Sequence, residues 1–145
     1  MNGRNRSILA RFGQAAIVAM LALCAASAPA SAQTVTIHPD GIVKSGVATV
    51  TGTFSAPVGT PVRMEVRVQQ FRHGQVIASA FTDLGPIIAD GSTQSWTATM
   101  FAPSGFKPGH AQVTVRLIET EYLGDGDGSE VLLAIAGATV QLHPR

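Results

Sequence analysis

Strict alternation of apolar and polar side chains is the feature that most limits what this chain can fold into. The pattern is cleanest along residues 62–70, where valine and methionine stand at even positions through 68 and arginine, glutamate or glutamine at odd ones. Side chains of a strand point alternately to opposite faces, so a period of two predicts a half-buried β-strand. No stretch of useful length has helical periodicity, and the chain is therefore predicted to be all-β.

The same alternation recurs along most of the chain after residue 33. It predicts further strands at residues 34–38, 46–54, 75–81, 93–101, 111–117 and 130–142. Turn signals at Pro39–Gly41, Arg72–Gly74 and Asp90–Gly91 separate several of them. About seven short strands with such spacing favour an antiparallel two-sheet sandwich. The expected inward rows are Ala48, Val50 and Phe54; Val62, Met64, Val66 and Val68; Trp96, Ala98 and Met100; Ala111, Val113, Val115 and Leu117.

Three positions within these rows carry extra information. Gly52 falls on an inward face, which indicates a bulge or the close approach of another backbone. The apolar parity changes after Leu117 to Ile118, which predicts a β-bulge there. Trp96, the only tryptophan, shares a face with apolar neighbours and is expected to be a core anchor.

The first 32 residues have the three parts of a secretory signal peptide. Arg4, Arg6 and Arg11 make a positive start, residues 15–26 are apolar, and Ala30–Ala32 offers the small side chains that signal peptidase requires. The apolar run is shorter than the roughly 20 residues needed to span a bilayer. We expect cleavage after Ala32 and a mature domain that begins at Gln33.

A lipoprotein is the alternative for the amino-terminal segment, because Cys24 could carry lipid. Leu23 precedes this cysteine, where lipoprotein processing normally uses a small residue. The expected product of cleavage after Ala32 is a single domain, residues 33–145, that is secreted or held in the periplasm or cell envelope. Its 113 residues fit one domain.

Charge and cysteine content narrow the functions open to residues 33–145. They carry seven basic and nine acidic side chains, a net charge of −2, and no basic cluster. This argues against binding nucleic acid and against a membrane-surface patch after processing. Cys24, the only cysteine, lies in the segment expected to be removed, so neither a disulfide nor a thiolate site is predicted.

Two segments resemble immunoglobulin-like and fibronectin type III-like domains. Residues 106–115 (FKPGHAQVTV) resemble the entry to the sixth strand, where an apolar plug, a Pro-Gly turn and an alternating strand recur. Residues 47–54 are similar to the second strand of bacterial immunoglobulin-like modules. The resemblance implies a β-sandwich with a binding or spacer role and no catalytic residue. The chain departs from the pattern in lacking the corner tyrosine, whose place falls at Gln112 or Val113, and the disulfide. Its tryptophan is in the fifth rather than the third apparent strand.

The most chemical-looking stretch is residues 125–130 (DGDGSE), where Asp125, Asp127 and Glu130 could supply oxygen ligands to calcium. The EF-hand pattern requires glycine at position six and glutamate at position twelve, and here Glu130 and Ala136 occupy those positions. A glycine-rich hairpin turn is the favoured interpretation, and we expect no metal and no cofactor.

The remaining titratable groups do not form a catalytic pattern. No Gly-x-Ser-x-Gly motif occurs. Glu119 and Glu121 are spaced to share one face of a strand, yet no cleft is evident around them. Of the histidines, His38 and His143 would meet only if the first and last strands lie side by side in parallel. We therefore expect no enzymatic activity.

The sequence predicts a secreted, non-enzymatic β-sandwich module that interacts with a protein or a cell-surface polymer. A carbohydrate-binding module is the first alternative, and five aromatic residues could form its stacking platform: Phe71, Phe81, Phe101, Phe106 and Tyr122. A small hydrolase or metal-dependent enzyme is the second alternative. A cleft with two or more titratable groups would favour it.

Overall fold

The computed structural model describes residues 32–121 and 128–145, and these residues contain strands and no helix. The expected all-β class is confirmed. The eight strands, in chain order, are β1 (Thr34–Ile37), β2 (Asp40–Lys44), β3 (Val47–Ser55), β4 (Pro61–Arg72), β5 (Gln75–Ile88), β6 (Gln94–Phe101), β7 (Gly109–Glu121) and β8 (Ser129–Pro144).

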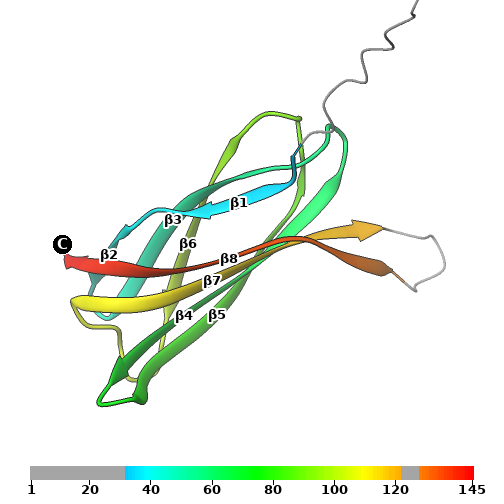
Figure 1. Ribbon diagram of the computed structural model, residues 1–145. Helices are drawn as coiled ribbons and strands as arrows, with labels where there is room; N and C mark the ends of the chain where they lie inside the picture. The colour runs from blue at the N-terminus through cyan, green and yellow to red at the C-terminus, as the bar shows by residue number, and fades with distance from the viewer. Residues whose placement is uncertain (1–31, 122–127) are drawn as a thin grey trace, which may run out of the picture.

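The strands form one open, mixed, hydrogen-bonded sheet (Figure 1). β6 pairs with one side of β3, while β1 and β2 pair with different halves of β3 on its other side. β2 then pairs with β8, which is followed by β7, β4 and β5. The arrangement therefore differs from the expected antiparallel pair of sheets: β2 joins the two groups of strands, and it runs parallel to β8.

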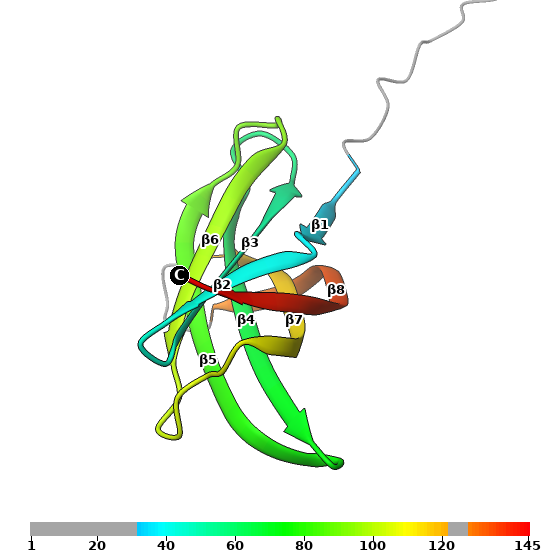
Figure 2. The same cartoon turned by 90° about the vertical axis from the view of Figure 1, so that its left-hand side faces the viewer.

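A single hydrophobic core lies between the two groups of strands. The core cluster joins apolar side chains of β3 and β6 to those of β4 and β7, although these strands share no hydrogen bonds across the core. The sheet therefore folds back on itself, and the two groups cross in Figure 2. All four expected inward rows are buried, and Val62, Met64, Val66 and Val68 are completely so.

Three expectations about single residues are confirmed. Trp96 is buried, and its indole Nε1 donates to the carbonyl oxygen of Thr36 at 3.1 Å. A Cβ on Gly52 would collide with that same carbonyl oxygen and would lie 2.6 Å from the Trp96 ring. The register between β7 and β8 shifts between Leu117 and Ile118, and both of these residues are buried.

The expected turn at Pro39–Gly41 is wrong at its last two residues, because Asp40 and Gly41 begin β2. A Cβ on Gly41 would lie 2.9 Å from the carbonyl oxygen of Thr49 and 2.8 Å from the side chain of Leu142. Glycine is needed here so that β2 can lie between β3 and β8. The residue that indicated a turn instead permits the close approach of three strands.

The hairpin expected at Arg72–Gly74 is confirmed. Arg72 pairs with Gln75, and both connecting residues have positive φ, 51° at His73 and 77° at Gly74. Such two-residue turns match the twist of paired strands. β5 then runs to Ile88, seven residues beyond the expected end of the strand.

Gln70 is the one buried polar side chain in the described part of the chain. Its amide nitrogen donates to the carbonyl oxygen of Lys107 at 2.7 Å, and its amide oxygen accepts from the Lys107 backbone nitrogen at 2.9 Å. The adjacent Phe106 is buried as the expected apolar plug, and its backbone nitrogen donates to Gly46. Gln70 thereby fixes the connection between β6 and β7 to β4.

Candidate functional site

The candidate site is the outer face of β5, β4 and β7, which lies away from the core. Odd-numbered residues of β4 project there because the even-numbered ones fill the core. Register places Phe81 of β5 and Thr114 of β7 on either side of Arg67. It also places Arg116 beside Glu65. Three separate strands thus bring a polar and aromatic set of side chains together.

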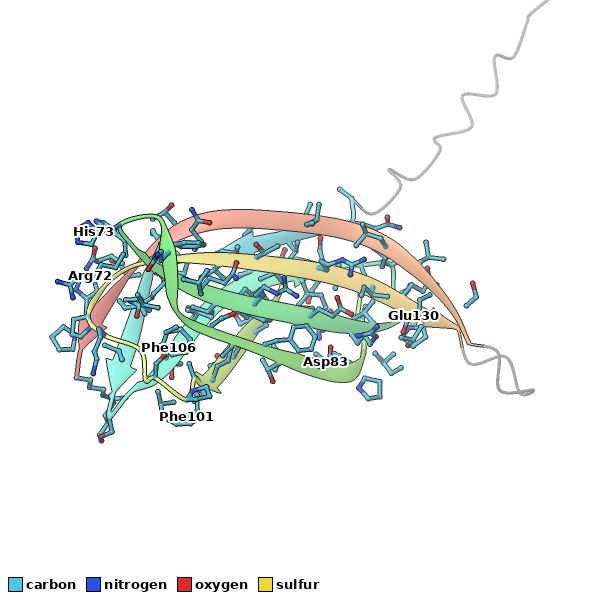
Figure 3. The ribbon with its side chains drawn as sticks, turned by 90° about the horizontal axis from the view of Figure 1, so that it is seen from below. Arg72, His73, Asp83, Phe101, Phe106 and Glu130 are labelled. Carbon is cyan, nitrogen blue, oxygen red and sulfur yellow. The ribbon has the colours of Figure 1, made fainter. Side chains whose placement is uncertain are left out.

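Arg63 organises one end of this face. Its Nη1 donates to Glu65 at 2.9 Å and to Asp83 at 3.0 Å, and its Nε and Nη2 grip the Glu130 carboxylate at 2.8–3.1 Å. The hydrogen bonds that the Arg63 guanidinium donates to Glu130 hold the pKa of Arg63 above its ordinary value. Figure 3 shows Asp83 and Glu130 at this end of the sheet, and Arg72 and His73 at the opposite end.

Glu65 lies between two guanidinium groups. One of its oxygens accepts from Arg63, and the other accepts from Arg116 at 2.9 Å. The Glu65 side chain is only 18% exposed, less than that of either arginine. Partly exposed ion pairs of this kind stabilise a fold by about 0–1 kcal/mol each. Their main effect here is to fix the positions of the side chains around Glu65.

A hollow of about 250 Å³ adjoins this network on the same face. In the strand register, Arg67 lies between Phe81 and Thr114, which also line the hollow. Arg67 has no ion-pair partner within the described residues. Phe81 contributes a ring that is about half exposed. The hollow thus combines two guanidinium groups, a carboxylate, an aromatic ring, an amide and a hydroxyl; its lining is Glu65, Arg67, Gln69, Phe81, Thr114 and Arg116.

The five aromatic residues considered for a stacking platform have different positions. Phe106 is buried in the core, and Tyr122 lies outside the described residues. Phe101 is exposed at the end of β6, a strand that pairs with β3 and not with β4 or β5. Phe71 and Phe81 are both exposed on the outer face of β4 and β5. Only these two of the five share a described face.

His38 and His143 both contact Asp40. The strand that runs parallel to β8 is β2, whereas the expected first strand, β1, pairs with β3. The His143 ring nitrogen Nε2 is 2.9 Å from the Asp40 carboxylate, and the Asp40 backbone nitrogen donates to Nδ1 of His38 at 3.2 Å. All three side chains are exposed. The two imidazoles thus contact different parts of one residue at the junction of β2 and β8.

The other proposed chemical groups have simpler surroundings. Asp125 and Asp127 lie outside the described residues, and Glu130 is engaged by Arg63. Glu119 lies between Val62 of β4 and Val131 of β8 in the register, with no carboxylate opposite it. In residues 32–121 and 128–145, no group of three or more histidine, cysteine, aspartate and glutamate side chains could hold a metal ion.

A second hollow, of about 470 Å³, lies among β1, β3 and β6, and its lining includes Trp96 and four threonines: Thr36, Thr51, Thr53 and Thr97. Its hydroxyl groups bond to one another across the strands, as Thr36 does with Thr53 at 2.7 Å. His38 is its only titratable group. Cross-strand hydrogen bonds between threonines are among the pairs that stabilise a sheet, so these contacts have a structural explanation.

β8 has an open edge along most of its length. It pairs with β7 throughout, but only Gln141–Pro144 pair with β2 on the other side. Residues 129–140 therefore present one row of backbone groups to which no described strand is paired. Figure 1 shows β7 and β8 reaching beyond the other strands near the connection that joins them.

Comparison with known proteins gives no relative of this chain. No family model matches it, and neither a curated protein nor a solved structure matches it. No helix in the described part of the chain could cross a membrane.

Proposed function

We propose that residues 33–145, released by cleavage after Ala32, form an immunoglobulin-like β-sandwich that binds a polypeptide strand outside the cell membrane and has no enzymatic activity. The order in which the strands pair supports the immunoglobulin-like assignment. β3 with β6 makes one group, β5-β4-β7-β8 makes the other, and one core lies between them. Phe106 fills the position of the apolar plug, and Gln70 does the anchoring that a corner tyrosine does in related folds.

The open edge of β8 is the observation that carries the binding function. An unpaired edge offers alternating N–H and C=O groups, and another extended chain can pair with them. Edges in natural proteins usually carry lysine, proline or a cover that prevents such pairing. No charged residue and no proline occurs from Val131 to Leu142. Val131, Leu132 and Ile135 are 46%, 48% and 61% exposed.

β5, the strand at the other side of the group β5-β4-β7-β8, has a different edge. It contains Asp83 and Pro86, and the Ser104 hydroxyl donates to the carbonyl oxygen of Ile77 at 2.6 Å. A charge, a proline and a bonded carbonyl all hinder the addition of a further strand. The edge of β8 is thus the better surface for strand addition.

A second copy of the chain is the proposed partner. Two identical edges can pair antiparallel about a two-fold axis, so that the unpaired backbone groups of each copy form hydrogen bonds with those of the other. The pairing segments bring no like charges together because residues 131–142 carry none. Alanine or glycine at positions 134, 136, 137 and 138 leaves room for the opposing strand.

Sedimentation of the exported protein across a range of concentrations tests this proposal. We expect a dimer that dissociates on dilution, and a monomer when Ile135→Lys places a charge on the edge. Val58→Lys is the matched control, because Val58 is 77% exposed in the loop after β3. A protein that stays monomeric at every concentration, or an Ile135→Lys variant that still dimerises, would contradict the proposal.

A further inference from the structure

We infer that the hollow around Arg67 and Phe81 binds a carboxylated sugar, a hexuronate unit of an extracellular polysaccharide. This site lies on the face of the sheet, whereas the proposed polypeptide site is the edge of β8. The two sites use different residues, so either one can be tested without the other.

The charge of the residues that line the hollow favours an anionic ligand. Both oxygens of Glu65 are engaged, by Arg63 and by Arg116. Arg67 has no ion-pair partner among the described residues, although it lines the same hollow. Two cations and one carboxylate leave the lining with a net positive charge. A guanidinium binds a carboxylate through two parallel hydrogen bonds, so a single carboxylate group suits Arg67.

The exposed ring of Phe81 favours a ligand that contains a sugar ring. Phe81 is 52% exposed and is the direct cross-strand neighbour of Arg67. The C–H face of a sugar ring can pack on such a ring while its hydroxyl groups remain polar. Gln69 and Thr114 line the same hollow and offer donors and acceptors to those hydroxyls. A small inorganic anion would use Arg67 but not Phe81.

The open shape of the face points to a polymer. Phe71 lies on the same face, four residues along β4 from Arg67, which is roughly 13 Å away in a strand. A chain of sugar units lying along β4 could therefore contact both phenylalanines. Asp83 and Glu130 stand beyond the Arg63 end of the hollow. They oppose a densely charged polyanion such as nucleic acid, whose phosphates are closely spaced.

Calorimetric titration of the exported protein with oligogalacturonate tests the inference. Dextran serves as the neutral polysaccharide, and polyglutamate as a carboxylate polymer without sugar rings. We expect binding to oligogalacturonate alone. Arg67→Gln should weaken it about tenfold or more, since charge-assisted bonds are lost. Phe81→Ala should weaken it about threefold or more, through loss of ring packing.

Matched variants separate a site from general charge and general hydrophobicity. Arg145→Gln removes one exposed positive charge beside β2 and β3, and Phe101→Ala removes an exposed ring from the end of β6. Both should bind as the unchanged protein does, and all four variants should keep its melting midpoint and its sedimentation behaviour. Absence of binding, equal binding to polyglutamate, or equal losses in Arg145→Gln and Arg67→Gln would overturn the inference.

Discussion

Replacement of Gln70 should destabilise the protein more than its modest size suggests. Gln70→Ala removes two hydrogen bonds to Lys107 and a longer one, 3.5 Å, to the carbonyl oxygen of His110, and it leaves the backbone N–H and C=O of Lys107 without their partners. A buried polar group left unpaired costs about 1–3 kcal/mol. Partial access of water to the Lys107 backbone reduces this cost, so we expect a loss of roughly 3 kcal/mol in total. In a domain of about 110 residues this corresponds to roughly 12 °C in the melting midpoint.

Gln70→Glu gives the same position a pH-dependent test. At neutral pH the carboxylate can still accept from the Lys107 nitrogen, but it faces the Lys107 carbonyl oxygen and cannot donate to it. The protonated acid has the shape of the amide and can donate, so folding should raise the pKa of this carboxyl group. A raised pKa means that the stability is present at low pH and is lost as pH rises through the folded-state value.

Thermal melting from pH 4 to pH 8, with amide hydrogen exchange at Lys107, measures both effects. Relative to the unchanged protein, Gln70→Glu should recover toward pH 4, whereas Gln70→Ala should stay equally destabilised throughout. Gln69→Glu is the matched control, because it makes the same substitution on the outer face of β4. If Gln70→Ala melts within about 2 °C of the unchanged protein, or if Gln70→Glu shows no recovery in acid, the reasoning is wrong.

Four further outcomes follow from the described contacts. Trp96→Ala should cost roughly 3–5 kcal/mol in chemical denaturation, because the indole is buried, and a near-normal unfolding curve would refute this. Gly52→Ala should cost about 1–3 kcal/mol or more, because the added Cβ would overlap the carbonyl oxygen of Thr36 and the Trp96 ring, and an unchanged melting midpoint would refute that. The Ser92 hydroxyl donates a hydrogen bond to Asp90 and lowers the pKa of its carboxyl group. The lowered pKa contributes stability above the ordinary carboxyl pKa, and this stability is lost as the pH falls through the folded-state value. NMR titration of Ser92→Ala should therefore show a higher pKa for Asp90. Millimolar calcium should leave the melting midpoint unchanged relative to chelator, because Glu130 is held by a guanidinium; a rise of on the order of ten degrees would show a calcium site.

The parts of the fold that the sequence predicted are those decided by local alternation. The row from Val62 to Val68 is buried because its period of two is independent of what it packs against. The bulge at Leu117–Ile118 was visible as a change of parity within one strand, and it occurs there. Gly52 was visible as an inward residue without a side chain, and another backbone approaches it.

The parts that were missed depend on which strands become neighbours. Asp40 and Gly41 belong to β2 only because β3 and β8 lie on either side of them. The extension of β5 to Ile88 depends on pairing with the first residues of β4. Gln70 continued the inward row of β4 and could have been identified as a buried polar residue. Its partner, Lys107, lies in a distant connection and could not have been identified.

The candidate site shows the same division at the level of chemistry. The odd-numbered side chains of β4 were expected to face outward, and Arg63, Glu65 and Arg67 line the outer face. What alternation could not supply was the register that places Phe81 and Thr114 beside Arg67. Glu130, considered above as a calcium ligand, is instead the partner of Arg63.

The charges on this face also explain why Arg67 is the residue to test. Five ionised groups, from Arg63 to Glu130, are joined by hydrogen bonds of 2.8–3.0 Å into one network. A network of this kind resists rearrangement because each side chain is held by at least one other. Arg67 is on the same strand as Arg63 and Glu65, but it forms no ion pair with the described members of this network. Arg67 is therefore the cation on this face that can bind a ligand without first breaking an ion pair to another described residue.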